Sequence, residues 1–359
     1  MREPSRRLRV ATWPAPSEFS RSPYLEYFHG AMGARGVVAL AGVVPTAQWL
    51  AEQRSAVDAI HIHWPDGLWR AGKRSMLTRI PAAVRLHRFW RDAGARGIKI
   101  IWTVHNLERH EGSNWLDRVC YRTLAGQCDA LICHSQSAAV EVRQRYRPPG
   151  EVVVMAMGSF PNLYPPPRPR LEVLERLGLN PELPVVCCLG NLRPYKGLMV
   201  ACEAAVRLKG VVQLVVGGRP YGNWVDVSTI RRLLEGEQVG VLIDRVLTDQ
   251  EFSDITAASE AVVLPYHNIT GSAALLTAWT LGRGVVASDL AYFREVSAGE
   301  PDAAAFFREG DPADLSNAIT GFLRVPFARR QAAAERLAAR YAWERCIEPV
   351  VDLFDRWKC

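Results

Sequence analysis

The sequence has no apolar run long enough to cross a bilayer, which takes roughly 18 residues. The longest candidate, GVVALAGVV at 36–44, stops at Pro45. The basic start, MREPSRRLRV, has neither the apolar core nor the cleavage site of a signal peptide. These absences predict a cytoplasmic protein, which could still contact a membrane peripherally.

Several fingerprints of cofactor and catalytic sites are also missing. No G-x-G-x-x-G follows the first predicted strand, and neither a G-x-x-x-x-G-K-[ST] loop nor a G-x-S-x-G elbow is present. The eight cysteines form no C-x-x-C pair, and most lie in apolar segments, where Cys packs as a small hydrophobe. We therefore predict reduced thiols, no metal site and no cofactor.

The positive charge of the chain is concentrated in its first half. Residues 1–165 carry 22 Lys and Arg against 13 Asp and Glu, a net +9, while the remainder carries 22 against 24, a net −2. Such a basic half indicates contact with an anionic surface, which could be nucleic acid, anionic lipid or a phosphorylated acceptor. Because no recognised nucleic-acid motif is present, we predict no nucleic-acid partner.

Short apolar runs alternate with helical patterns along the whole chain of 359 residues. Continuous apolar strands separated by helices predict parallel sheets covered on both faces, the doubly wound α/β architecture. The predicted strands are 8–13, 36–40, 59–63, 98–104, 130–134 and 151–155, and then 185–189, 211–216, 239–243, 261–265 and 284–288.

A proline-rich segment separates the two series of strands. Five prolines within 161–169 are incompatible with a sheet or helix interior, so we expect an interdomain linker there. The prediction is two Rossmann-like domains, 1–165 and 166–340, that face a central cleft. A helical segment at 341–359 follows, in which Pro349 should end or kink a helix. Ligands of such sheets bind outside the carboxyl ends of the strands.

Two strand ends of the second half could bind phosphate. GNLRPYKG at 190–197 places Arg193 and Lys196 just after a strand, and a fork donor beside a mobile point charge suits a diphosphate. The alternative is an ordinary charged surface loop. Further on, Gly271 and Ser272 precede a helix whose N-terminus could hold a phosphate, although Ser272 could equally be a plain N-cap. Two such elements in one domain favour the diphosphate.

Polar residues also gather at strand ends of the first half. We expect Asp66, His105 and Glu108 to face the cleft, where a carboxylate or imidazole could act as general base. His61 and His63 share one face of a strand and are more simply read as core or rim histidines. Others in these segments are Asn106, His110, Glu111, His134 and Ser135.

A basic and apolar segment at 72–97 could form a helix that lies on an anionic membrane. Its predicted membrane or acceptor face includes Arg79, Arg85, Arg88 and Trp90. The alternative is a crossover helix of the sheet with one solvated basic face.

Together these motifs resemble the GT-B glycosyltransferases of family four and their bacterial relatives. HWPD, TVHNLERHE, RPYKG and LPYHNITGSAALLTAW are most similar in style to bacterial exopolysaccharide β-mannosyltransferases. The resemblance implies a nucleoside-diphosphate sugar donor, with GDP-mannose as one option, and a glycan or lipid-linked acceptor. It also implies a C-terminal helix that crosses back to the first domain.

The resemblance assigns roles to residues at matching positions. Arg193 and Lys196 would bind the donor diphosphate, Gly271 and Ser272 its distal phosphate, and His105 would approach the donor sugar.

Three positions depart from the family pattern. Asn191 stands where an arginine is usual, and Ile269 and Thr277 stand where two glutamates hold the donor. Without these glutamates, we predict an inverting transferase. We expect no metal, because cations and helix ends would neutralise the diphosphate, and position at a strand end makes Asp66, or second Glu108, the candidate base. Two alternatives stay open: a GT-B sugar-nucleotide epimerase, and a catalytically silent protein that binds anionic lipid or polysaccharide.

Overall fold

The structure, a computed structural model, describes residues 8–53, 56–70, 75–109 and 112–358. The chain forms two compact units: one contains the residues up to Gly158 together with Trp343 and those after it, and the other is Ser159–Ala342. The chain therefore passes from one unit to the other twice. His110 and Glu111 lie outside the described residues.

The first unit is built on a parallel sheet of six strands in the order β2-β1-β3-β4-β5-β6. Its strands are β1 (Leu8–Trp13), β2 (Val37–Gly42), β3 (Ala59–His63), β4 (Lys99–Thr103), β5 (Ala130–Cys133) and β6 (Glu151–Val154). Because β2 and β3 lie on opposite sides of β1, the strand order reverses there. In doubly wound sheets ligands bind at such a reversal, outside the carboxyl ends of the strands.

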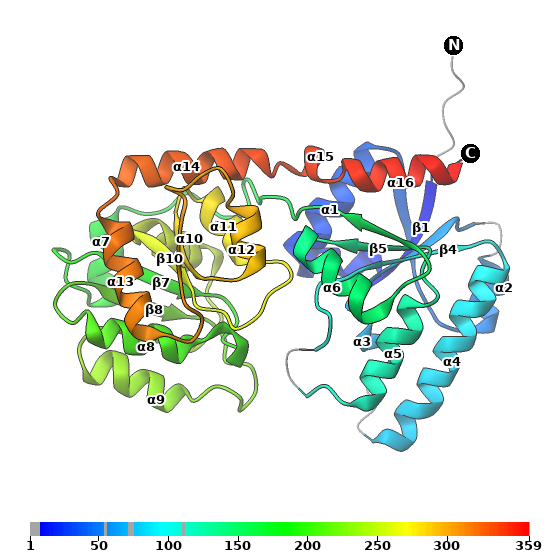
Figure 1. Cartoon of the computed structure of the whole chain (residues 1–359), viewed down its shortest axis with the longest axis horizontal. Helices are drawn as coiled ribbons and strands as arrows, with labels where there is room; N and C mark the ends of the chain where they lie inside the picture. Colours follow the sequence, from blue (N-terminus) through cyan, green and yellow to red (C-terminus); the bar gives the residue numbers. More distant parts are fainter. Residues whose placement is uncertain (1–7, 54–55, 71–74, 110–111, 359) are drawn as a thin grey trace, which may run out of the picture. The chain divides into compact units, whose positions relative to one another are not determined.

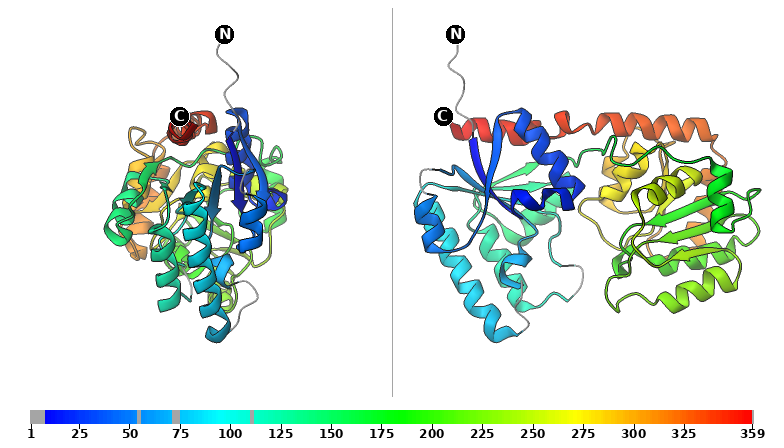
Figure 2. Two further views of the ribbon diagram at one scale, coloured as in Figure 1. Left: turned by 90° about the vertical axis from the view of Figure 1, so that its right-hand side faces the viewer. Right: turned by 180° about the vertical axis from the view of Figure 1, so that it is seen from behind.

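Helices cover both faces of this sheet (Figure 1). They are α1 (Pro23–Ala34), α2 (Ala47–Glu52), α3 (Asp66–Arg70), α4 (Met76–Ala95), α5 (Trp115–Ala125), α6 (Gln136–Tyr146), α15 (Trp343–Cys346) and α16 (Glu348–Lys358), with a 3₁₀ turn η1 (Pro16–Arg21). Helices α4 and α5 bury one side of the sheet, where Ile60, Trp102 and Leu131 are almost fully buried. α1 and α16 lie on the other side (Figures 1 and 2).

The second unit repeats this plan with the strand order β12-β11-β10-β7-β8-β9. Its strands are β7 (Val185–Leu189), β8 (Gln213–Gly217), β9 (Gly240–Ile243), β10 (Ala261–Leu264), β11 (Val285–Ser288) and β12 (Ala304–Phe307). After β7 the chain adds β8 and β9 toward one edge of the sheet, and after β10 it adds β11 and β12 toward the opposite edge. The reversal therefore falls between β7 and β10, which are paired neighbours.

The helices of the second unit also lie on both faces of its sheet (Figure 1). They are α7 (Arg170–Leu177), α8 (Leu198–Arg207), α9 (Val227–Arg231), α10 (Asp249–Ala258), α11 (Ala273–Thr280), α12 (Ala291–Val296), α13 (Pro312–Leu323) and α14 (Phe327–Arg340), with a 3₁₀ turn η2 (Pro194–Lys196) and a π-helical segment η3 (Arg232–Gly236).

The α/β prediction is confirmed, and every predicted strand is present within about two residues of its expected bounds. β12 is the one strand among the described residues that the sequence did not predict. Its sequence, AAFF, follows one more alanine, Ala303, and alanine favours helices. Pairing with β11 and the burial of Phe307 in the core outweigh that preference.

The structure places Pro349 at the start of a helix and the proline-rich segment 161–169 within the second unit. Helix α15 ends at Cys346, and Pro349 is the second residue of α16, where its missing N–H costs no helical hydrogen bond. The proline-rich segment at 161–169 belongs to the second unit and packs on α10. There the Ser253 hydroxyl donates to the Pro165 carbonyl over 2.7 Å, and the Arg168 amide donates to Asp254 over 2.8 Å. The passage between the units therefore precedes the prolines.

Candidate functional site

Two loops of the second unit follow β7 and β10 at the reversal of strand order. Residues 190–197 lead from β7 into α8, and residues 265–272 lead from β10 into α11. The His267 amide in the second loop donates to the Tyr195 carbonyl in the first over 2.8 Å. The structure thus brings the segment with Arg193 and Lys196 against the segment that ends in Gly271 and Ser272.

Gly197 allows the two loops to approach so closely. Its φ is +61°, in the left-handed region, and a Cβ at this position would lie 1.9 Å from the Pro265 carbonyl oxygen. Residues with a side chain are therefore excluded at Gly197 by both backbone conformation and space.

Lys196 is a buried cation at this site. Its side chain is only 9% exposed, its ammonium lies 3.5 Å from the Leu189 carbonyl oxygen, and no carboxylate in the described part of the chain pairs with it. Burial, with a contribution from the nearby Arg193 guanidinium, lowers the pKa of Lys196 from 10.5 to about 8. A buried ammonium without an anionic partner is costly for the fold, and a bound anion would offset that cost.

Arg193 is held beside the same loop by an aromatic ring. Its guanidinium carbon lies 4.0 Å from the centre of the Tyr221 ring, a cation–π contact. Tyr221 follows β8, and its amide donates to the Leu192 carbonyl over 2.9 Å. The contact limits the conformations of the half-buried Arg193 side chain, which keeps its charge at the strand ends.

Ser272 caps α11, as its alternative interpretation expected. Its hydroxyl accepts a hydrogen bond from the Leu275 amide over 3.2 Å, and its own amide donates to the Tyr292 hydroxyl over 3.0 Å. The amides that remain for an anion are those of the first residues of the helix, which have no intrahelical partner. Ser272 therefore positions the helix start, next to the half-buried Gly271.

Two tyrosines complete this site and were not among the predicted residues. The Tyr266 ring lies 5.7 Å from the Lys196 ammonium, and its hydroxyl contacts Ser272, so it connects the two loops. Tyr292 holds the Ser272 amide. Tyr266 directly follows the predicted strand AVVLP, so its position could have indicated that it belongs to the site. Tyr292 lies 20 residues from its partner Ser272, and no signal in the sequence connects the two.

The two positions that lack the expected glutamates have different surroundings. Thr277 lies inside α11 with only 5% of its surface exposed, and Ile269 is half-buried in the loop before that helix. Neither residue can supply the carboxylate.

A cluster of histidines lies at the carboxyl ends of β3, β4 and β5 in the first unit. His61 hydrogen-bonds the Thr103 hydroxyl over 2.8 Å, and His63 hydrogen-bonds His105 over 3.0 Å. His134 donates from Nδ1 to the Met155 carbonyl over 3.1 Å.

These rings are neutral at physiological pH. Burial lowers the pKa of His61, His63 and His105 well below 6.5, and it lowers the pKa of His134 to about 4. Among the described residues, Nε2 of His63 and Nε2 of His134 are buried without a hydrogen-bond partner. Such orphaned nitrogens would gain from hydroxyl groups of a ligand.

One part of this cluster has a spacing that a metal ion could bridge. Ring nitrogens of His29, His61 and His63 lie within 4.8 Å of one another. His29 comes from α1 and stacks on Phe19 at a centroid distance of 4.1 Å. The predicted lack of a metal stays a prediction, and these are the residues at which to test it.

The two candidate bases are both engaged by arginines. Asp66, the first residue of α3, forms an ion pair with Arg109. Glu108 forms one with Arg145 and lies 3.7 Å from the Arg118 side chain. Asp66 and Glu108 follow neighbouring strands, and each would have to exchange its arginine contact for a substrate hydroxyl.

The predicted membrane or acceptor face lies on α4 and needs one correction. Arg85 and Arg88 are exposed and Arg79 is half-buried, but Trp90 is only 3% exposed. Trp90 packs in the core beside Phe89, with ring centroids 4.8 Å apart. Its assignment to an outer face is wrong, because Trp90 belongs to the stripe of α4 that covers the sheet.

Both units match known protein families. Residues 183–324 match the family described as Glycosyl transferases group 1, and residues 10–158 match Glycosyltransferase Family 4.

The chain is also similar to individual enzymes. It is 25% identical to Alpha-maltose-1-phosphate synthase of Mycolicibacterium smegmatis, over 72% of this chain and 73% of that protein. It is 26% identical to D-inositol 3-phosphate glycosyltransferase of Geodermatophilus obscurus, over 64% and 52% respectively. It is 25% identical to GDP-mannose:glycolipid 4-beta-D-mannosyltransferase of Xanthomonas campestris pv. campestris, over 68% and 66%. The matches thus span about half to three quarters of these relatives.

Solved structures share the fold. Sucrose-phosphate synthase (tll1590) from Thermosynechococcus elongatus superposes with a TM-score of 0.71 at 16% identity, over 98% of this chain and 99% of that one. Anabaena Alr3699/HepE in complex with UDP-glucose superposes with a TM-score of 0.68 at 14% identity, over 97% and 100%.

Proposed function

Because the chain belongs to the GT-B glycosyltransferases, we propose that it moves a sugar from a nucleoside-diphosphate sugar to a hydroxyl group of a glycan or lipid-linked acceptor. The observation that carries the proposal is the buried Lys196 ammonium at the β7–β10 reversal, without a carboxylate partner among the described residues. A diphosphate there would supply the missing negative charge. Arg193 and the start of α11 offer further positive charge and amides.

The identity of the donor is the first question for experiment. One relative is named for GDP-mannose, and one structural neighbour was solved with UDP-glucose. We expect one class among UDP, GDP, TDP and ADP sugars to raise the melting temperature, because a ligand that binds only the folded state stabilises it. GDP-mannose is our first choice. If none of these nucleotides shifts the unfolding transition, the transferase proposal fails and a silent binding protein is favoured.

The proposed reaction is a single displacement. The acceptor hydroxyl attacks C1 of the sugar, its proton passes to a base, and the nucleoside diphosphate leaves with the bonding electrons. Arg193, Lys196 and the N-terminus of α11 stabilise the charge that develops on the leaving group. We place the acceptor in the first unit, with His105 near the donor sugar. The absence of carboxylates at Ile269 and Thr277 supports inversion, and an NMR assignment of the product anomer would test it.

Asp66 is our first candidate for the base, and Asp66→Asn should lower kcat about 10²–10⁴-fold, because general-base catalysis typically contributes that much. Initial-rate kinetics with saturating donor would measure the loss. Glu108→Gln is the parallel variant for the second candidate, and urea unfolding of both proteins would control for loss of the Arg109 or Arg145 contact. If Asp66→Asn turns over at the wild-type rate, Asp66 is not the base.

We also propose peripheral contact with an anionic membrane, carried by Arg79, Arg85 and Arg88 of α4. This contact would bring a lipid-linked acceptor to the first unit. Within the described residues no helix is both long and apolar enough to span a bilayer.

A further inference from the structure

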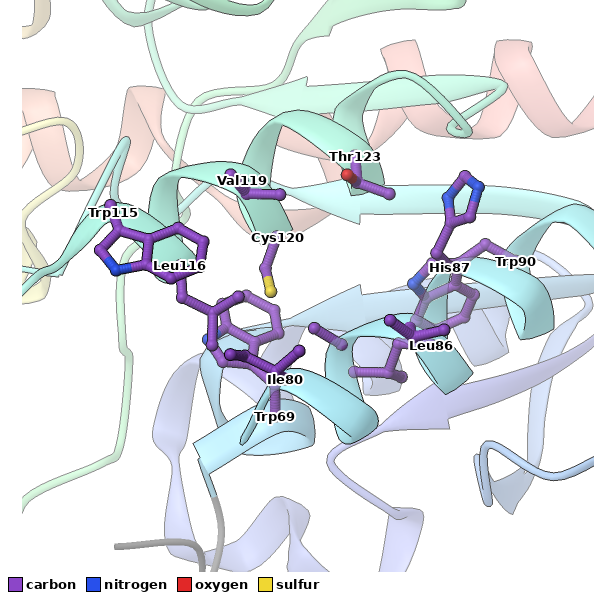
Figure 3. A pocket seen from close by; sticks show the side chains of 12 residues that line it. Trp69, Ile80, Leu86, His87, Trp90, Trp115, Leu116, Val119, Cys120 and Thr123 are labelled. Carbon is purple, nitrogen blue, oxygen red and sulfur yellow. The ribbon is translucent and has the colours of Figure 1, made fainter. Parts of the chain in front are cut away.

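A groove of about 360 Å³ lies between α4 and α5 in the first unit (Figure 3). Its walls are apolar side chains of both helices, which point toward one another across the gap in Figure 3. Representative lining residues are Ile80, Val84, Trp115, Leu116 and Val119. The volume lies at the lower end of the roughly 300–1,000 Å³ that is typical of small-molecule sites.

The groove exists because α4 has two apolar stripes. One contains Leu86, Phe89 and Trp90 and is buried in the core, although Leu86 and Trp90 also line the inner part of the groove. The other contains Ile80 and Val84, which lie on one helix face by their four-residue spacing and are 41% and 45% exposed. An ordinary crossover helix needs only the first stripe to cover its sheet.

Helix α5 supplies the opposite wall in the same way. Trp115 and Val119 are four residues apart and are 58% and 51% exposed. Soluble proteins rarely gather large exposed apolar side chains in one place, and such a patch marks a binding surface. The lining has few polar groups: His87 and Thr123 offer them, whereas the indole N–H of Trp69, which α3 contributes, is already bonded to Asp117 over 2.9 Å.

Arginines continue these exposed stripes. Arg88 lies four residues after Val84, and Arg122 lies three residues after Val119, so each shares a helix face with a groove residue. In the described part of the chain, Arg85, Arg88 and Arg122 have no carboxylate partner. An occupant that satisfies both features has a hydrocarbon part and a negative charge.

We propose that this groove takes the hydrocarbon chain of an anionic membrane lipid, while the arginines contact the phosphate headgroups. The inference rests on the proposed membrane contact and adds the site at which the lipid enters. A second copy of the chain is a poorer occupant, because a symmetric contact would bring the arginines of the two copies together. Membrane anchoring commonly needs both apolar burial and basic charge, and the two are adjacent here.

Vesicle co-sedimentation tests the proposal with the full chain and without any donor. We expect binding to phosphatidylcholine vesicles that contain phosphatidylglycerol, and little binding to phosphatidylcholine alone. The double variant Val84→Ser and Val119→Ser should weaken binding about tenfold, because two apolar side chains no longer enter the acyl region. Arg85→Gln with Arg88→Gln should weaken it roughly 30-fold at low salt, and added salt should weaken wild-type binding.

The matched control is Val140→Ser with Val211→Ser, at valines that are 48% and 50% exposed outside the groove. This control should bind as the wild type does. Lipids brominated in the acyl chain should also quench part of the tryptophan fluorescence, and the Trp115→Phe variant should lack this quenched part. Contact with the headgroups alone would not produce such quenching.

Each result decides between specific alternatives. If the wild type does not bind anionic vesicles, both the membrane contact and the groove proposal are overturned, while the proposal of donor binding in the second unit still stands. If it binds and the groove variant equals its control, only the groove proposal is overturned. If sedimentation velocity shows a dimer that the groove variant dissociates, the occupant is a second copy.

Discussion

Lys196→Met is expected to abolish most transfer and yet to make the unliganded protein more stable. In the proposed reaction the ammonium would contact the charge that grows on the leaving diphosphate, so its loss should lower kcat/KM about 10²–10³-fold. The same ammonium is buried without an anion, and a pKa of about 8 in place of 10.5 measures what its burial costs. Removing it should raise the free energy of unfolding at pH 7 by up to about 3 kcal/mol.

The pH dependence gives an internal check on this result. Between about pH 8 and 10.5 the unfolded state of the wild type holds the Lys196 proton and the folded state does not. The free energy of unfolding of the wild type should therefore rise through this window, and the advantage of the Met variant should disappear there. Urea titrations at several pH values measure the free energy of unfolding of both proteins.

Lys209→Met, at an exposed lysine that pairs with Glu237, is the matched control and should change neither transfer activity nor the free energy of unfolding. A Met variant that is active, or that is less stable at pH 7, would contradict the assignment.

Gly197→Ala should damage both stability and donor binding. The added Cβ would lie 1.9 Å from the Pro265 oxygen, at a φ of +61°, so the two strand-end loops would have to separate. We expect a loss of about 2–4 kcal/mol in the free energy of unfolding, and a loss of the donor-induced thermal shift.

A second glycine separates the steric cost from the conformational one. Gly210 follows α8, has a φ of +75°, and has open space around its Cβ position. Gly210→Ala should cost only about 1 kcal/mol and leave donor binding unchanged. Equal losses in the two variants would mean that the contact between the loops is unimportant.

The strands were predictable because their sequences are short, apolar and rich in β-branched residues. The runs at 59–63 and 185–189 match β3 and β7 to the residue. Strand β12 was not predictable, because its alanines carry no strand signal and it becomes a strand only by pairing with β11. The apolar residues of α4 were evident, but sequence alone could not show which of its two apolar stripes covers the sheet. Trp90 was therefore assigned to the wrong one.

The candidate site was predictable where it depends on position along a strand. Lys196 and Gly271 lie in the loops that follow β7 and β10, and the strand order places these two loops at one reversal. Contacts between distant residues could not be predicted. The pairing of Asp66 with Arg109 joins residues 43 apart, and that of Glu108 with Arg145 joins residues 37 apart. The burial of Lys196 likewise depends on Tyr266, which comes from another strand end.

The double passage between the units gives the chain an unusual order of completion. The second unit, Ser159–Ala342, is continuous in sequence, whereas the first unit needs α15 and α16 from the end of the chain. Trp343 shows how closely the late segment fits, because a Cβ on Gly158 would lie 2.3 Å from its ring. On the ribosome, β1 therefore emerges before the second unit, yet the unit that contains β1 is completed only after the second unit has emerged. Until α16 arrives, the surface that receives its buried Val350, Leu353 and Phe354 stays open to water and to chaperones.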